Sequence, residues 1–393
     1  MPQIPAGEYQ ARMKKMTDLL DVSGLDALLL TAEANVNYFT GYVPWSSWTT
    51  FTRPTVLLIS KLAPPILIVQ DVWLGAARRD SQIGDIRGYS RLGGLPVDIV
   101  SQALADMGLA NSRIGAELGY EQRLGVSYID FDAIKQHVPR CAFVDASSLI
   151  WKLRTIKSKA EIACIKEACK GAFTVFESAF DSIRAGMTEH QVVQFFHRAA
   201  AEIGMDIGFI IPVTGPASYH AMTSRTTGRE LVNGDMVWVD LSLIHCDYRS
   251  DFSRAAVVGG PSDGQKRLWE QVHNVTMSGV KRMAPGVPIT EVVLACSEEA
   301  SRRGLSIGSF STGRLGHGIG LMTTEPPHIS LYDNTVLEPG MVLAIEPGVI
   351  TDDGVFVAEQ DVAITESGFE ILTEGFWELQ TIQGAAPAVG ITA

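Results

Sequence analysis

The 393-residue sequence contains little cysteine, and its five cysteines are scattered without a Cys-x-x-Cys pair. This pattern excludes a disulfide framework and a zinc knuckle and indicates reduced thiols. Basic residues are also few, because 32 Lys and Arg stand against 44 Asp and Glu, a formal net charge of −12. Nucleic acids and anionic membranes bind basic surfaces, so we expect neither as a partner.

Long apolar runs are absent as well. Stretches such as residues 207–213 are far shorter than the roughly 20 residues that span a bilayer. The first residues carry charge but lack the apolar segment and small-residue cleavage site of a targeting signal. We therefore expect a cytoplasmic protein. Hydrophobic residues make up 46% of the chain, enough for a sizeable core, and its length predicts about two domains.

The first third of the chain alternates helix and strand patterns. Helical spacing of apolar residues over 8–22 is followed at 25–31 by a dense apolar run that is typical of a buried strand. Further elements are expected in the same region: strands at 55–60 and 65–70, and helices at 96–107 and 125–137. This alternation predicts an α/β domain.

The composition changes near residue 152, where a basic and polar segment begins. A capping box of Ser158 and Glu161 predicts the start of a long helix, and a second pattern, Thr188 with Gln191, predicts another. The predicted division is residues 1–152, residues 153–383 and a flexible tail of small residues over 384–393.

The second predicted domain contains an internal repeat. A helix–glycine–helix pattern occurs twice, with Gly186 and Gly286 each expected to end a helix. LVNGDMVWVD, which ends at Asp240, is matched by LEPGMVLAIE, which ends at Glu346. Each half also has an upstream histidine and a second acidic strand: His220 and Asp251, then His317 and Glu359. Two such units imply a packed domain with a pseudo-twofold axis rather than a solenoid.

Acidic residues within apolar runs are the strongest candidates for chemistry. A single Asp in a strand is usually a surface residue, but Asp240 in WVDLSL and Glu346 in LAIEPG stand among apolar neighbours. The other candidates have ordinary alternatives: Asp251 as a partner of Arg249 or Arg254, Glu359 or Asp361 pointing outward, His317 in a glycine-rich turn, and His220 in a capped loop. The recurrence of the acids at matching places in both halves favours function.

Two hairpins are expected to bring four carboxylates to adjacent strands in the centre of the sheet: Asp240, Asp251, Glu346 and Glu359. Such a buried cluster is strongly unfavourable unless cations compensate it. We therefore predict two divalent metal ions, with His317 completing one coordination shell. The oxygen-rich donor set suits Mn, Co or Fe and tolerates Zn. Two ions can share a water and polarise a carbonyl, and His220 could then donate to that oxygen or bind a substrate carboxylate.

These motifs together resemble the creatinase/prolidase/aminopeptidase P family of pita-bread metalloenzymes. The resemblance covers essentially the whole chain and is carried by the order D…D…GHGIG…EPG…E, by LR-x-IKS-x-x-EI and by NVNYFTGY at residues 35–42. It implies an α+β fold in which a C-terminal pita-bread domain with a pseudo-twofold repeat follows a smaller α/β domain. It also implies a homodimer, in which Trp45 and Trp48 could reach the neighbour's active site or equally pack within their own domain.

The resemblance assigns roles to individual residues. The implied ligands of the dinuclear metal centre are Asp240, Asp251, His317, Glu346 and Glu359. His220 takes the place of the first catalytic histidine, and we also expect a catalytic role for Glu346.

Two positions depart from the pattern of the proline-specific members. Those peptidases usually have a second histidine seven residues after the ligand histidine, where this sequence has Thr324, and an arginine two residues before the last glutamate, where it has Val357. His328 follows nearby and could substitute, so Thr324 and His328 are candidate substrate-binding residues. Arg225 or Arg229 could hold a substrate carboxylate, although we favour their interpretation as solvated loop charges.

We therefore predict a dinuclear-metal-dependent hydrolase that cleaves an amide bond of a small substrate with a metal-bridging hydroxide, most like an Xaa-Pro dipeptidase or aminopeptidase. The alternative is a non-peptidase enzyme acting on a small molecule, either a C–N hydrolase of the creatinase or ectoine-hydrolase type or a dimethylsulfoniopropionate-lyase-like enzyme. A third interpretation is a binding module without activity. The five intact ligands argue against it, because a binder has no need of buried acids.

Overall fold

The computed structural model describes residues 3–44, 53–222, 225–307, 313–373 and 375–384. Contacts divide the chain into two compact units, Ile4–Arg154 and Thr155–Ala393, the latter joined by the first three residues. The boundary predicted at residue 152 lies inside helix α6 (Ser147–Arg154). Trp45, Trp48 and residues 385–393 of the predicted tail lie outside the described residues. None of the helices in the described ranges is long and apolar enough to cross a membrane.

The first unit is a mixed six-stranded sheet with helices, in the strand order β4-β3-β2-β1-β5-β6. Its strands are β1 (Ala27–Leu30), β2 (Val56–Ser60), β3 (Ile66–Gln70), β4 (Asp85–Tyr89), β5 (Arg113–Ala116) and β6 (Ala142–Asp145). Besides α6, its helical elements are α1 (Ala6–Ser23), α2 (Glu33–Thr40), η2 (Asp71–Trp73), α3 (Leu74–Asp80), α4 (Val97–Asp106) and α5 (Tyr128–His137). The predicted helices and strands of this region are confirmed. Both faces of β1 and β2 are buried, which explains their unbroken apolar sequences.

The NVNYFTGY segment forms α2 and its C-terminal cap. Gly41 ends the helix at φ 77°, a left-handed conformation that favours glycine. Asn35 is fully buried, and its amide donates to Glu117 Oε1 at 2.6 Å and accepts from Arg154 Nη1 at 2.7 Å. The motif therefore stabilises the first unit through a buried polar network.

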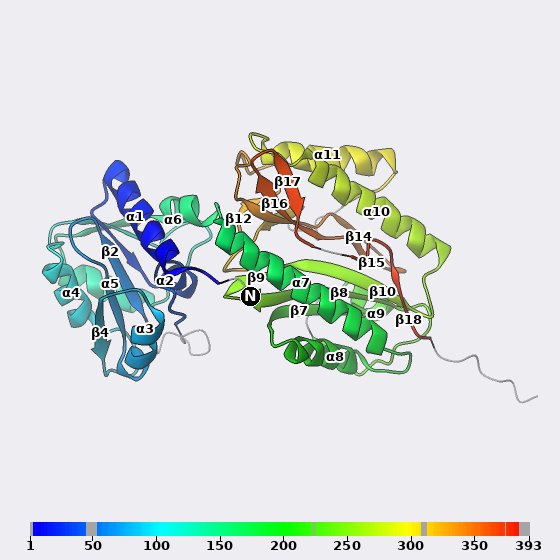
Figure 1. The fold of residues 1–393 in the computed structure, drawn as a ribbon, viewed down its shortest axis with the longest axis horizontal. Coiled ribbons are helices and arrows are strands. Elements are labelled where there is room, and N and C mark those ends of the chain that lie inside the picture. The colour runs from blue at the N-terminus through cyan, green and yellow to red at the C-terminus, as the bar shows by residue number, and fades with distance from the viewer. Residues whose placement is uncertain (1–2, 45–52, 223–224, 308–312, 374, 385–393) are drawn as a thin grey trace, which may run out of the picture. The chain divides into compact units, whose positions relative to one another are not determined.

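The second unit contains two series of elements, each of which begins with two helices and continues with strands (Figure 1). The first series is α7 (Lys159–Ser182), α8 (Glu189–Glu202), β7 (Asp206–Thr214), α9 (Pro216–Tyr219), β8 (Met236–His245), β9 (Tyr248–Arg249) and β10 (Phe252–Val258). The second is α10 (Asp263–Arg282), α11 (Ile289–Arg302), β11 (Gly316–Gly318), β12 (Glu325–His328), β13 (Val342–Ile345), β14 (Gly348–Thr351), β15 (Gly354–Val357), β16 (Gln360–Thr365), β17 (Gly368–Ile371) and β18 (Gln380–Ile382). Both predicted capping boxes are present, at the starts of α7 and α8.

Equivalent backbone hydrogen bonds support the repeat. Gly186 N donates to Leu231 O and Gly286 N donates to Leu337 O, each at 2.8 Å. The expectation that these glycines end helices was wrong, because α7 and α10 end at Ser182 and Arg282. The glycines lie in the following loops at φ 84° and 82°, where each binds the first residue of the LVNGD or LEPG segment of its own half.

The acidic strands belong to two sheets rather than one, which corrects the expectation of a single sheet. One sheet has the order β18-β10-β8-β7, with β9 paired to β8, and the other has the order β12-β11-β13-β16-β17. The hairpin β14–β15 forms a separate two-stranded sheet. Helix α7 contacts β8, α8 contacts β7, and α10 contacts β13 and β15. Figure 1 shows α10 and α11 side by side on one side of these strands and α8 on the opposite side.

Candidate metal centre

The four predicted acidic ligands lie at equivalent places in the two sheets. Asp240 is within β8, opposite Ser253 of the antiparallel neighbour β10, and Asp251 immediately precedes β10. Glu346 directly follows β13, and Glu359 directly precedes β16, its antiparallel neighbour. Ile345 of β13 pairs with Gln360 of β16. The residues next to this pair, Glu346 and Glu359, therefore lie at the same end of the two strands.

The structure brings all five predicted ligands together. Carboxylate oxygens of Asp240, Asp251 and Glu359 lie within 4.8 Å of one another. The Nε2 atom of His317 lies 3.4 Å from Asp251 Oδ2 and 3.6 Å from Glu346 Oε1. Side chains from both halves of the repeat therefore converge on one small volume.

The histidine presents a lone pair to the acids. Its Nδ1 lies 3.0 Å from the carbonyl oxygen of Gly318, a contact that assigns the proton to Nδ1. Burial lowers the pKa of His317 to about 3, so the ring is neutral at pH 7. The neutral Nε2 faces the carboxylates of Asp251 and Glu346 and has no proton to donate to them. A cation between these atoms would remove the repulsion between the nitrogen lone pair and the carboxylate oxygens.

The raised pKa values of the acids also indicate a cation site. Burial raises the pKa values of Asp240, Asp251 and Glu359 well above their usual range, and the neighbouring carboxylates add to the shift. Burial also raises the pKa of Glu346 to about 7. The buried Oδ1 atom of Asp240 has no hydrogen-bond partner in the described part of the chain. Four carboxylate groups and one imidazole are a hard donor set that fits divalent Mn, Fe, Co or Zn.

Asp361 is a fifth acidic group at this site, and its role was left ambiguous by the sequence. Rather than pointing outward, it is fully buried, and its Oδ2 accepts from Asp251 N at 2.9 Å and from Cys169 Sγ at 3.2 Å. Burial raises the pKa of Asp361 to about 7. The two-residue spacing from Glu359 was the signal, because residues two apart along a strand share one face.

A cavity of about 320 Å³ opens onto the acid cluster. Its described lining residues are Phe209, Ile211, Asp240, Asp251, Arg314, His317, Thr323, Thr324 and Glu346. Thr324 therefore lies at the cavity, as expected for a substrate-binding residue. His328 is buried on β12 and is not among these lining residues, but its Nδ1 lies 3.0 Å from Nη1 of Arg314. Arg314 was missed, although a cation three residues before His317 in a glycine-rich segment was a visible signal.

The structure does not bring His220 to this cavity. It follows the short helix α9, its side chain is 61% exposed, and its Nε2 lies 3.4 Å from Asp352 Oδ1. It is not among the described residues that line the cavity. The position of Val357, where an arginine was expected from the family pattern, is buried, and its carbonyl accepts from Ser253 Oγ at 3.3 Å.

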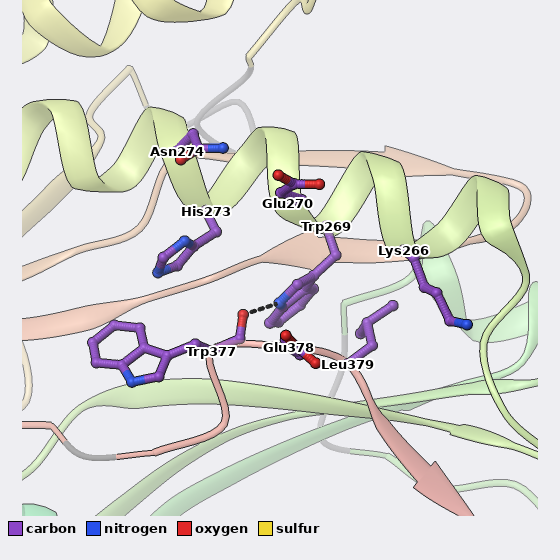
Figure 2. A pocket seen from close by; sticks show the side chains of 8 residues that line it. All are labelled: Lys266, Trp269, Glu270, His273, Asn274, Trp377, Glu378 and Leu379. Atoms are coloured by element: carbon purple, nitrogen blue, oxygen red, sulfur yellow. Dashed lines mark hydrogen bonds between the residues drawn. The ribbon is translucent and has the colours of Figure 1, made fainter.

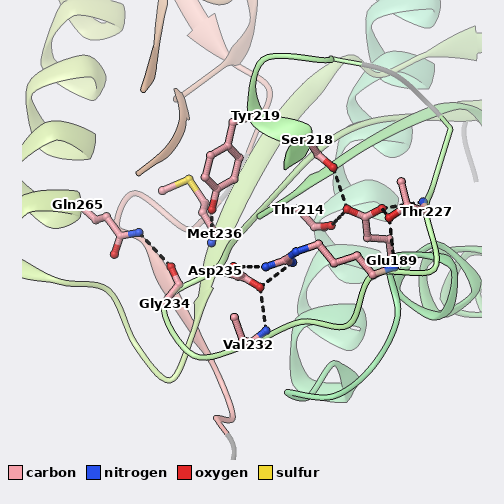
Figure 3. Close-up of polar contacts among 11 residues, drawn as sticks. Glu189, Thr214, Ser218, Tyr219, Thr227, Val232, Gly234, Asp235, Met236 and Gln265 are labelled. Atoms are coloured by element: carbon pink, nitrogen blue, oxygen red, sulfur yellow. Dashed lines mark hydrogen bonds and ion pairs between the residues drawn. The ribbon is translucent and has the colours of Figure 1, made fainter. Parts of the chain in front are cut away.

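The loop after β7 is fixed by a second buried carboxylate, Glu189 (Figure 3). Its Oε1 accepts from Thr214 Oγ1 at 2.6 Å and from Ser218 Oγ at 2.8 Å, and its Oε2 accepts from Thr227 N at 2.6 Å. Burial alone would raise the pKa of Glu189, but these hydrogen bonds outweigh it and hold the pKa below its usual value. These hydrogen bonds compensate the negative charge of Glu189 and hold the segment that contains His220 in place.

Arg229 belongs to the same region and is not a solvated loop charge. Its guanidinium forms two contacts with the buried Asp235, Nη1 to Oδ2 at 2.8 Å and Nη2 to Oδ1 at 2.9 Å. This bidentate pair occupies the guanidinium and leaves it unsuited to hold a substrate carboxylate. Arg225 is exposed.

A second cavity, of about 480 Å³, lies beside α10 (Figure 2). Its described lining residues are Lys266, Trp269, Glu270, His273, Asn274, Trp377, Glu378 and Leu379. The indole N–H of Trp269 donates to Trp377 O at 3.0 Å, and the His273 ring meets the Trp377 ring edge to face at 5.2 Å. Within the described ranges, three potential metal-ligating side chains converge at the acid cluster and not here, so the candidate metal centre is the smaller cavity.

Comparison with known families covers most of the chain. The family model of metallopeptidase family M24 matches residues 163–366, and that of the creatinase/prolidase N-terminal domain matches residues 12–156.

Individual relatives match along nearly their whole length. An Xaa-Pro dipeptidase of Pyrococcus horikoshii is 28% identical, over 94% of this chain and 98% of the relative, and an uncharacterised peptidase of Bacillus subtilis is 26% identical, over 94% and 99%. Among solved structures, the prolidase of Pyrococcus horikoshii superimposes with a TM-score of 0.80 at 26% identity, covering 93% of this chain and 99% of that one. An Xaa-Pro dipeptidase from Bacillus anthracis gives a TM-score of 0.81 at 26% identity, covering 95% and 100%. The predicted α+β pita-bread fold with its N-terminal domain is confirmed.

Proposed function

Because the chain belongs to metallopeptidase family M24 and is a hydrolase of the creatinase/prolidase type, we propose that it cleaves the amide bond before proline in small Xaa-Pro peptides. Members of this family use divalent metal ions, and we propose two per chain. The observation that carries the proposal is the convergence of His317 with acids from both halves, with Nε2 3.4 Å from Asp251 and 3.6 Å from Glu346.

The proposed ligands of the two ions are Asp240, Asp251, His317, Glu346 and Glu359. When bound, the ions would supply Lewis-acid polarisation of the scissile carbonyl and lower the pKa of an attacking water. Glu346 is the acidic residue best suited to move a proton, since its side chain is 21% exposed at the cavity and burial raises its pKa to about 7. Phe209 and Ile211 line the same cavity with apolar surface, which suits an apolar substrate ring and excludes water.

The catalytic role of His220 stays a prediction. Because its ring is exposed beside Asp352, it reaches a reacting group only if the α9 turn moves or the substrate extends to it. A positioned general acid contributes about 10²- to 10⁴-fold to a rate. A loss of that size in His220→Ala, with unchanged metal content, supports the role, and a loss below about tenfold removes His220 from the catalytic machinery.

The direct test is an assay of the purified protein loaded with Mn²⁺, Co²⁺ or Zn²⁺. The substrates are Xaa-Pro dipeptides, longer peptides with an N-terminal Xaa-Pro, and alanyl-alanine as the control that lacks proline. We expect turnover of at least one proline peptide, little turnover of alanyl-alanine and complete loss after chelation. No turnover of any proline peptide with Mn²⁺ or Co²⁺ present contradicts the proposal.

A second candidate function rests on Thr324 and Val357. Thr324 lines the cavity where the proline-specific pattern has a histidine, and Val357 is buried where that pattern has an arginine. These replacements favour a non-peptidase enzyme that acts on a small molecule. Creatine, ectoine and dimethylsulfoniopropionate therefore belong in the same assay, and turnover of one of them without turnover of any proline peptide selects this candidate.

We also propose a cytoplasmic homodimer, as the scattered cysteines and the family resemblance predict. Size-exclusion chromatography with light scattering tests the assembly. A mass near twice that of one chain supports the dimer, and a single-chain mass at micromolar concentration contradicts it.

A further inference from the structure

Arg314 is the one cationic side chain among the described residues that line the acid cavity. It stands three residues before His317 and is partly buried. No other residue considered as a carboxylate holder is in this position, because Arg229 is bound to Asp235 and Arg225 is not among the described lining residues. The question is what the guanidinium of Arg314 binds.

The guanidinium is held from one side and retains unused donors. Its Nη1 lies 3.0 Å from Nδ1 of His328, whose backbone N–H donates to Asp333 Oδ2 at 2.8 Å. Its Nε is buried and has no hydrogen-bond partner within the described ranges. A buried donor without a partner costs roughly 1–3 kcal/mol, so within the described ranges the contact with His328 leaves the guanidinium incompletely satisfied.

The acids of the cluster do not occupy this guanidinium. In the described part of the chain, no carboxylate oxygen lies within the 4.0 Å ion-pair distance of Arg314, whereas Arg229 and Asp235 meet at 2.8 Å. If two divalent ions are bound as proposed above, they balance the charge of four carboxylate ligands. The positive charge of Arg314 then has no counterion in the cavity and attracts an anionic group of the substrate.

We propose that Arg314, oriented by His328, binds a free carboxylate of the substrate and thereby restricts the enzyme to small carboxylic acids such as dipeptides. This inference rests on the proposed metal-dependent function. The planar fork of Arg matches a carboxylate through two parallel hydrogen bonds, which a lysine cannot reproduce. A cavity of about 320 Å³ is close to the lower end of ligand-site volumes and suits a dipeptide better than a longer chain.

The first experiment measures binding rather than turnover. Calorimetric titration of the Mn²⁺-loaded protein with proline and with prolinamide compares two ligands that differ in the free carboxylate. We expect the wild type to bind proline at least tenfold more tightly. Arg314→Gln is expected to weaken proline binding about 10- to 100-fold, because a hydrogen bond to a charged group is lost, and to leave prolinamide binding unchanged. Metal content is measured for every variant.

Two further variants separate a carboxylate site from a structural role. Arg314→Lys keeps the positive charge but loses the planar guanidinium that can donate two parallel hydrogen bonds. We therefore expect this variant to bind proline more weakly than the wild type and more tightly than Arg314→Gln. Arg302→Gln changes an exposed arginine of α11 and should alter neither affinity nor metal content. Equal weakening of proline and prolinamide, loss of bound metal in both Arg314 variants, or equal wild-type affinity for the two ligands overturns the inference.

Kinetics then distinguish this inference from the proposed function. Alanyl-proline is compared with alanyl-prolinamide, and creatine, ectoine and dimethylsulfoniopropionate, which also carry carboxylates, are included. Turnover of one of these three that depends on Arg314, without turnover of a proline peptide, refutes the proline specificity but supports the carboxylate site. Turnover of alanyl-proline and alanyl-prolinamide at equal kcat/KM supports the peptidase but refutes the carboxylate site.

Discussion

Two kinds of buried carboxylate occur in the second unit, and their surroundings differ in one respect. Glu189 is surrounded by hydroxyl and N–H donors from Thr214, Ser218 and Thr227, and its pKa is held below the usual value. The acid cluster instead contains carboxylates that face one another, with pKa values raised by burial and a buried Asp240 oxygen that lacks a partner in the described part of the chain.

The difference separates a structural anion from a cation site. Hydrogen-bond donors compensate the negative charge of Glu189 within the protein, so this residue needs nothing from solution. The cluster has too few donors for its negative charge, and a neutral His317 adds a lone pair rather than a proton. In the proposed function divalent ions supply the missing compensation, and their removal should therefore affect the two sites very differently.

Chelation is expected to have the largest effect. Treatment with EDTA followed by dialysis should abolish activity and lower the unfolding temperature by roughly 5–15 °C, since ions present at 100 to 1,000 times their dissociation constant contribute about 3–4 kcal/mol. Differential scanning calorimetry with and without re-added Mn²⁺ measures the shift. Full activity in the metal-free protein would refute a role of metal in the reaction.

Substitution of His317, the single histidine among the proposed ligands, comes next. We expect His317→Ala to lower kcat/KM by at least about 10³-fold and to reduce bound metal below two ions per chain, because the cluster loses its neutral donor. Elemental analysis measures the metal. The matched control is His273→Ala in the aromatic cavity beside α10, which should retain wild-type metal content. Equal metal content in both variants would exclude His317 as a ligand.

A moderate effect is expected at Asp361, which positions Asp251 without joining the predicted ligands. Asp361→Asn retains an oxygen for the backbone N–H of Asp251 but removes the negative charge behind it. Loss of such a supporting group typically weakens metal affinity about 10- to 100-fold. Competition with a metal-sensitive dye measures the change. An affinity within twofold of the wild type would show that Asp361 is only a packing residue.

The smallest effect on activity is expected at Glu189. Glu189→Gln should keep metal content and change kcat/KM less than about threefold, but lower the free energy of unfolding at pH 7 by about 1–3 kcal/mol through lost charge-assisted hydrogen bonds. A pKa depressed in the folded protein stabilises it above the usual value of 4.5 and ceases to do so as pH falls through the folded pKa. The stability difference between wild type and variant should therefore shrink below about pH 4.5 in urea titrations. A pH-independent difference would contradict the charged state of Glu189.

The sequence predicted which side chains converge in the acid cluster because its signals are local and repeated. Asp240 and Glu346 lie within apolar strands, and the two halves place their acids in the same order, which a surface carboxylate has no reason to do. The capping boxes at Ser158 and Thr188 were predictable for a similar reason, since each motif spans only four residues.

Other features depend on contacts that no local pattern specifies. Strand partners are chosen by tertiary packing, so the two sheets could not be distinguished from one. The roles of Gly186 and Gly286 were assigned wrongly because a glycine shortly after a helix can belong to the following turn, as both do here. Arg314 and Asp361 were missed or left ambiguous because a charged residue close to a motif is exposed more often than buried. The outward position of His220 also depends on the Glu189 network, which lies far away in the sequence.

Anomalous diffraction from crystals grown with Mn²⁺, recorded at the manganese absorption edge, tests the central claim most directly. Two strong peaks within coordination distance of the oxygen and nitrogen donors of Asp240, Asp251, His317, Glu346 and Glu359 are the expected result. An ordered cluster of the same side chains with no anomalous peak among them, in crystals of a protein that hydrolyses its substrate, would contradict the claim that cations compensate these buried acids.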